Sequence, residues 1–302
     1  MNLWQQYLRP QTIPDAIQAL ITAPGPARPI AGGTDLLLDL QQGRQSAVHT
    51  LVDLTNIPEL SLIEERRDEL FIGAAAPLHK IVSHPLVRLH ALALVEASDL
   101  VGGPQVRNVA TLGGNVAHAL PAADGTIALH ALGAELEIAG KAGLRRMNFE
   151  NFFLGPGKSA LKPGEEILVG FGIPLNHRDG KEASCFKRIM RPQGVALPII
   201  NVAIWLIRQE EMIEDIRIAV GPGGPTPWRA KEAEQVLRGE SISVSAGGGS
   251  FANLGSIHSA MQALLDHVKF RSSLRRASSE YRRHIVENLF VDTLSTAWMR
   301  TY

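Results

Sequence analysis

The segment "TLGGNVAHALPAAD", residues 111–124, decides how this chain folds and what it holds. It combines two adjacent glycines with Asn115 in a run of small residues that has almost no charge and ends at Asp124. A second glycine pair lies in "PIAGGTDLLLDL", residues 29–40. Glycine lets a ligand approach the main chain closely, and the free N–H groups at a helix start favour phosphate oxygens. The two glycine segments are therefore candidates for ligand-binding loops.

The first loop, "AGGTD" at 31–35, follows an expected strand and precedes an expected helix, "DLLLDLQQG". Thr34 is the expected N-cap of that helix and Gly43 its expected stop. The loop could cradle a phosphate, although its glycine spacing matches neither a Walker A loop nor a G-x-G-x-x-G fingerprint. Taken alone, an ordinary strand–helix turn explains it as well.

The second loop adds hydrogen-bonding groups at Thr111 and Asn115. The Asp124 carboxylate could accept hydrogen bonds from ribose hydroxyls, as the acidic residue of nucleotide sites does. Alternatively, Asp124 caps a helix that begins near Gly125. Two such loops, with Gly33 and Gly113 lying 80 positions apart, suit the two phosphates of a dinucleotide.

Composition excludes several classes of protein. Thirty basic residues balance thirty acidic ones, so no net field attracts nucleic acid or an anionic membrane. The longest apolar run, 195–207, is too short to span a bilayer and reads as a buried strand. Cys185 is the only cysteine, so the chain cannot by itself form an internal disulfide, a Cys-ligated iron–sulfur cluster or a Cys-based zinc site. With no recognisable signal peptide, we expect a cytoplasmic protein.

The alternation of helical and strand patterns predicts an α+β chain. We expect helices over 13–23 and 125–132, and a composition change after the polar stretch 175–182 suits a domain boundary. The ten histidines show no ligand spacing, so we predict no metal site. No acid/base constellation stands out either, and we predict no catalytic residue on this chain.

Several segments, in the same order, resemble the FAD-binding subunit of molybdenum-containing hydroxylases, which includes the medium subunit of carbon monoxide dehydrogenase and the FAD domain of xanthine dehydrogenase. The segments are "AGGTDLL" (31–37), "FIGAAAPL" (71–78), "QVRNVATLGGNVAHALPAAD" (105–124), "FFLGPGKSALKPGEEILVGFGIP" (152–174), "FKRIMR" (186–191), "RIAVGPGGPTPWRAKEAE" (217–234) and "SSEYRRHIVENLF" (278–290).

The resemblance implies a two-subdomain FAD-binding domain of the vanillyl-alcohol-oxidase (PCMH) type, over 1–57 and 58–176, followed by a C-terminal α+β domain over 177–302. It implies FAD as the cofactor. The implied FAD-binding residues are Pro29, Ile30, Ala31, Gly32, Gly33, Thr34, Asp35, Leu36, Val101, Thr111, Gly114, Asn115, Asp124, Val169 and Lys187.

Within that set, residues 29–36 would hold the pyrophosphate, and Lys187 matches a family lysine near the flavin. A cation there would stabilise the reduced, anionic flavin and raise its potential; an ordinary surface lysine is the alternative. One departure stands out: Ala196 and Leu197 occupy the places where relatives often carry an Asp–Tyr pair, which puts the shielding of the flavin ring in doubt.

The resemblance also implies a role. Electrons would pass from a molybdopterin-binding large subunit, through a small subunit with two [2Fe–2S] clusters, to FAD on this chain, and then to an external acceptor such as NAD⁺, a quinone or oxygen. The chain would work in a heterotrimer, duplicated to a dimer of heterotrimers. A stand-alone FAD-dependent dehydrogenase with its own small-molecule substrate is the alternative.

Overall fold

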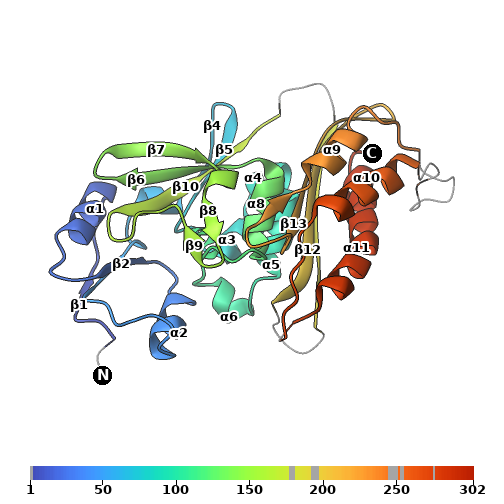
Figure 1. Ribbon diagram of the computed structural model, residues 1–302. Helices are drawn as coiled ribbons and strands as arrows, with labels where there is room; N and C mark the ends of the chain where they lie inside the picture. The colour runs from blue at the N-terminus through green and yellow to red at the C-terminus, as the bar shows by residue number, and fades with distance from the viewer. Residues whose placement is uncertain (1–2, 177–180, 192–196, 244–250, 252–254, 275) are drawn as a thin grey trace.

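The computed structural model describes residues 3–176, 181–191, 197–243, 251, 255–274 and 276–302. Sheets and helices are mixed throughout, which confirms the predicted α+β class. Three lobes follow the chain order, from the small N-terminal lobe through a central lobe to a C-terminal sheet backed by helices (Figure 1). The ranges 1–57, 58–176 and 177–302 stay predicted domain bounds.

The N-terminal lobe is a parallel three-stranded sheet with two helices. Its strands, in spatial order, are β1 (Gln6–Leu8), β3 (Thr50–Asp53) and β2 (Ala27–Ile30), and its helices are α1 (Ile13–Ile21) and α2 (Leu36–Gln41). The predicted helix over 13–23 is confirmed as α1, which begins at a Thr12 cap whose hydroxyl accepts from the Asp15 N–H at 3.2 Å. The prediction of Thr34 as the cap of α2 is wrong, because the chain is already in the α region at Asp35, which takes the N-cap position.

The central lobe is an antiparallel five-stranded sheet covered by short helices. The spatial order is β4 (Ile63–Arg66), β5 (Glu69–Gly73), β10 (Glu166–Pro174), β6 (Glu135–Gly140) and β7 (Gly143–Asn148). The helices are η1 (Pro58–Ser61), α3 (Leu78–Ser83), α4 (Pro85–His90), α5 (Leu92–Asp99), α6 (Pro104–Arg107), α7 (Leu112–Ala117), α8 (Asp124–Leu132) and η2 (Phe149–Asn151). A hairpin of β8 (Phe153–Gly155) and β9 (Lys158–Ser159) completes the lobe.

The C-terminal lobe is an antiparallel four-stranded sheet backed by helices. The sheet orders β11 (Lys181–Met190), β12 (Pro198–Gln209), β13 (Met212–Gly221) and β14 (Trp228–Arg229); the helices are α9 (Lys231–Leu237), α10 (Gly255–His267) and α11 (Ser279–Met299). The apolar run at 195–207 falls largely in β12, which is buried along nearly its whole length. A strand buried on both faces reads as continuous apolar sequence because neither face meets water.

One face of this C-terminal sheet packs against the central lobe, and the other packs against the helices of its own lobe. Phe186, Ala203 and Trp205 belong to the core shared with α5 and α8 of the central lobe. Their neighbours Cys185 and Ile204 belong to the core under α10 and α11. Side chains alternate along a strand, so consecutive residues of β11 and β12 face different lobes.

Helix α8 lies between the central lobe and the C-terminal sheet, and all nine of its residues are buried. A helix with every residue buried must be covered on every side by neighbouring elements. Its position makes the C-terminal sheet a wall of the central lobe (Figure 1). None of the helices among the described residues has the length and apolarity needed to cross a membrane.

Candidate functional site

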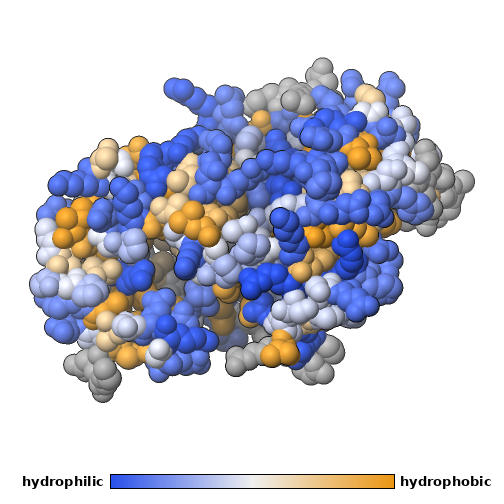
Figure 2. All heavy atoms as spheres, in the orientation of Figure 1, coloured by the Kyte–Doolittle hydropathy of each residue, from blue (hydrophilic) through white to orange (hydrophobic). Residues whose placement is uncertain are grey.

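The two glycine segments touch each other. A Cβ on Gly32 would lie 2.0 Å from the carbonyl oxygen of Val109 and 2.8 Å from the Cα of Ala110. No side chain fits at such a distance from backbone atoms. Residues 31–35, which follow β2, are therefore packed directly against the chain that enters α7. Two segments far apart in sequence form one backbone surface between the N-terminal and central lobes, where the face shown in Figure 2 is hollowed.

The first segment presents unused backbone donors. Gly33 has φ +69°, a conformation that favours glycine. Its carbonyl accepts from the Leu37 N–H at 3.0 Å, but within the described ranges the N–H groups of Gly32, Gly33 and Thr34 donate to no protein acceptor. Pro29 and Ile30 end β2 and Leu36 opens α2. The loop that joins them, which includes the half-buried Ala31 and the exposed Asp35, can therefore donate several hydrogen bonds to an anion.

The second segment begins α7. The Thr111 hydroxyl accepts from the Gly114 N–H at 3.1 Å and caps the helix. The Thr111 Oγ1 atom, 3.2 Å away, is the one neighbour that a Cβ on Gly114 would meet within 4 Å, so Gly114 borders open space. The Oδ1 atom of Asn115 is buried and, among the described residues, accepts no hydrogen bond. This segment offers a ligand a close backbone approach and one unused amide oxygen.

Asp124 is buried at the start of α8, with 4% of its surface exposed. Its Oδ1 accepts from Asn201 Nδ2 at 2.7 Å, and its Oδ2 pairs with Arg188 Nη1. Ala123, not Asp124, holds the N-cap position of the helix. Burial raises the pKa of the Asp124 carboxyl, and the charge of Arg188 and the amide of Asn201 oppose that rise.

The other three predicted contact residues lie on separate segments of the chain, and Lys187 faces away from the central lobe. Val101 is half-buried and packs on the core of the central lobe. Val169 is buried at a bulge in β10, where its carbonyl accepts from the Ala74 N–H at 2.8 Å. Lys187 lies on the α11 face of β11, and its Nζ is 2.7 Å from Asp292 Oδ1.

The structure describes one of the two residues expected to affect the shielding of the flavin ring. Leu197 is exposed, and Ala196 lies outside the described residues. Arg188 and Asn201 are the residues that sequence reasoning missed. The available signal is strand alternation, which places the residue after Lys187 on the opposite face of the sheet; the structure shows that this face meets α8.

Comparison with known proteins gives the family. Residues 3–176 match the family model described as "FAD binding domain in molybdopterin dehydrogenase". The chain belongs to this family. Residues 184–297 match a second model, the carbon monoxide dehydrogenase flavoprotein C-terminal domain. Both the resemblance seen in the sequence and the expected order of domains are confirmed.

Relatives of known title extend over nearly the whole chain. The putative xanthine dehydrogenase FAD-binding subunit of Escherichia coli (strain K12) is 32% identical and covers 96% of this chain and 95% of its own. The carbon monoxide dehydrogenase medium chain of Hydrogenophaga pseudoflava is 26% identical and covers 98% and 97%. This family member is therefore a medium, FAD-binding subunit of the xanthine and carbon monoxide dehydrogenase type.

Solved structures agree with the fold. Carbon monoxide dehydrogenase from Hydrogenophaga pseudoflava superposes with a TM-score of 0.87 at 25% identity, covering 98% of both chains. Quinoline 2-oxidoreductase from Pseudomonas putida 86 gives 0.86 at 27% identity, also over 98% of both chains. FAD is the family's cofactor, and the residues present suit it: unused N–H groups, open space at Gly114 and an unpartnered Asn115 oxygen match the donors and acceptors of a dinucleotide.

Proposed function

We propose that this chain is the electron-transfer subunit of a heterotrimeric molybdenum hydroxylase. It receives electrons from the [2Fe–2S] clusters of a small partner subunit and delivers them to an external acceptor. A molybdopterin-binding large subunit carries out the hydroxylation, and two heterotrimers associate in the cytoplasm. The relatives support this proposal because proteins named as a subunit or a medium chain match over 95% and 97% of their own length. The single cysteine supports it as well, since the chain cannot ligate a cluster.

The observation that carries the proposal is the contact between Gly32 and the Val109 carbonyl. That contact brings the unused N–H groups of residues 32–34 beside the chain that enters α7. A dinucleotide needs such a pair of side-chain-poor segments, because its phosphates must approach the backbone closely.

The chain's own residues then have distinct roles. Residues 29–36, with Gly32, Gly33 and Thr34 central, hold the pyrophosphate through backbone N–H groups. Thr111, Gly114 and Asn115 line the cofactor, and the Asp124 carboxylate accepts from ribose hydroxyls. Val101 and Val169 exclude water from the flavin ring of FAD.

Lys187 supplies positive charge near the flavin in this proposal. Bound FAD itself would supply the reversible acceptance of electrons that connects the iron–sulfur clusters with a two-electron acceptor.

The test is purification of the complex from its own cells through a tag on this chain. The proposal predicts one FAD per chain by visible spectrum, together with molybdenum and iron in the same peak. It also predicts that flavin bleaching on substrate addition follows cluster reduction in rapid-mixing spectra. A chain that purifies alone, with FAD, and oxidises a small molecule by itself would instead be a stand-alone dehydrogenase.

A further inference from the structure

The carboxylate of Asp124 is held entirely from the C-terminal lobe. Arg188 and Asn201 reach it from β11 and β12, and the side chains of Arg188 and Asp124 are only 6% and 4% exposed. Water therefore does not solvate this carboxylate, and its orientation is set by two protein donors. A buried carboxylate without such donors would be strongly disfavoured as a charged group.

The two donors form one rigid unit. Arg188 and Asn201 are directly paired partners across the antiparallel β11–β12 ladder, so both side chains leave the sheet at the same point and on the same face. Asn201 Nδ2 also donates to the Ala122 carbonyl at 3.1 Å. One amide group thus ties down both the turn before α8 and the carboxylate at its start.

Within the described ranges, Arg188 forms no ion pair other than the one with Asp124. Arg188 Nε and Asn201 Oδ1 are buried and, among the described residues, make no hydrogen bond. Besides Asp124, the one other hydrogen-bond partner of the Arg188 guanidinium in the part of the chain that the structure describes is the Met190 sulfur, at 3.1 Å. The energetic reason to bury Arg188 here is therefore the carboxylate.

We propose that Arg188 and Asn201 are positioning residues that keep the Asp124 carboxylate charged and oriented for the ribose of FAD. The C-terminal lobe then completes the nucleotide half of a site whose loops belong to the other two lobes. This inference rests on the proposed function, because it takes Asp124 to be an FAD contact.

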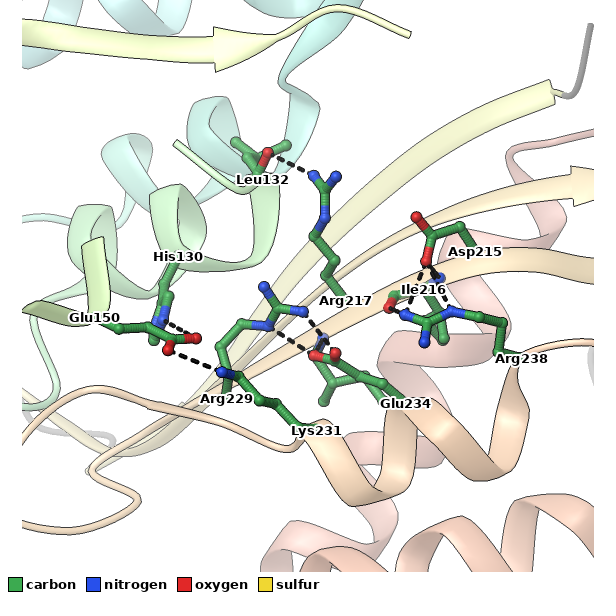
Figure 3. A network of polar contacts seen from close by, with 11 residues as sticks. His130, Leu132, Glu150, Asp215, Ile216, Arg217, Arg229, Lys231, Glu234 and Arg238 are labelled. Atoms are coloured by element: carbon green, nitrogen blue, oxygen red, sulfur yellow. Dashed lines mark hydrogen bonds and ion pairs between the residues drawn. The ribbon is translucent and has the colours of Figure 1, made fainter. Parts of the chain in front are cut away.

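Arg217 provides a matched control at the other end of the same helix. Its Nη1 donates to the Leu132 carbonyl at 3.0 Å, where α8 ends, as Figure 3 shows. Like Arg188, it is an arginine of the C-terminal sheet that bonds to α8, but it does not touch Asp124. Substitution of either arginine should weaken the packing between the lobes, whereas only substitution of Arg188 should disturb the position of the Asp124 carboxylate.

The experiment is titration of FAD into the full-length chain stripped of flavin, for wild type, Arg188→Met, Asn201→Leu, Arg188→Lys and Arg217→Gln. We expect Arg188→Met and Asn201→Leu each to weaken FAD binding on the order of tenfold. Arg188→Lys should recover most of the loss, because it restores a buried charge. Arg217→Gln should bind FAD like wild type.

A double-variant comparison separates positioning from a structural role. If Arg188 acts through Asp124, Arg188→Met should weaken FAD binding no further in an Asp124→Asn background. This neutral pair also avoids an unpaired buried charge, so it remains usable if Arg188→Met alone does not fold. Circular dichroism confirms folding of each variant before titration.

Additive losses in the double variant, equal losses for Arg188→Met and Arg217→Gln, or wild-type affinity in both Arg188→Met and Asn201→Leu would each overturn the inference. Those results leave the proposed function intact as long as wild type binds FAD. If wild type itself binds no FAD, the proposed function fails first.

Discussion

The contact between the two glycine segments makes Gly32→Ala the sharpest single test of the site. The new methyl carbon would lie 2.0 Å from the Val109 carbonyl oxygen, and ordinary van der Waals contact begins at 3.4 Å. The loop must therefore retreat by more than an ångström, because the obstacle is backbone and cannot rotate away. Overpacking of this kind costs about 1–3 kcal/mol of stability.

The effect on FAD should exceed the effect on stability. A displacement of about 1 Å moves the N–H groups of residues 32–34 away from the phosphates; in enzyme active sites a misplacement of that size can cost about 100-fold in rate, which we take as the upper bound here. We therefore expect the dissociation constant for FAD to rise between about tenfold and 100-fold. Fluorescence titration of the flavin-free chain measures it directly.

Gly43→Ala is the control, in the same lobe. Gly43 has φ +67° and open space around its Cα, so alanine costs about 1–2 kcal/mol through backbone strain alone. Both variants should lower the melting temperature by a few degrees, but only Gly32→Ala should lose FAD. If Gly32→Ala binds FAD as tightly as Gly43→Ala, the loop contact does not form the cofactor site.

Three further predictions test other parts of the structure. Gly114→Ala should leave stability nearly unchanged, because the new methyl group meets only Thr111 Oγ1. It should weaken FAD binding in the same titration, because the methyl group occupies the open side of the site; an unchanged affinity would mean that this open side does not face FAD. His130 is buried; among the described residues neither ring nitrogen makes a hydrogen bond, although Nε2 lies 4.0 Å from Glu150 Oε1. Burial, aided by the charges of Arg229 and Lys231, lowers the pKa of His130 to about 3. Since the unfolded chain takes up a proton below about pH 6.5 and the folded one does not, the wild type should lose about 2 kcal/mol of stability between pH 8 and pH 5 that His130→Phe retains in urea unfolding; the same pH dependence in both proteins would show that the ring is protonated in the fold. Lys187→Met should lower the reduction potential of bound flavin by about 20 mV in a dye-coupled titration, corresponding to about 1 kcal/mol for two electrons; an unchanged potential would leave Lys187 only its contact with Asp292.

Local sequence patterns predicted much of the fold, because the spacing of apolar residues reflects which faces of a helix or strand are buried. The continuous apolar run that forms β12 indicated a buried strand, and the helical spacing of residues 13–23 predicted α1. The ends of helices were predicted less accurately. Thr34 has the side chain of a cap, yet the positive φ of Gly33 and the helical conformation of Asp35 move the helix start by one residue.

The surroundings of Asp124 were beyond the reach of local reasoning. Its partners are 64 and 77 positions away, and their identity depends on which face of β11 meets α8. Sequence pattern places Lys187 and Arg188 on opposite faces of one strand but does not say which face belongs to which lobe. The family lysine therefore drew attention to one face, while the structure pairs Asp124 with the arginine on the other.

Helix α8 explains why the C-terminal lobe matters to a cofactor site that it does not border in sequence. The helix carries Asp124 at its first residue and ends at Leu132, and the C-terminal sheet bonds to both ends. A helix buried on every side has no freedom to adjust independently, because interiors are close-packed. Any shift of the sheet must move the carboxylate relative to the glycine loops.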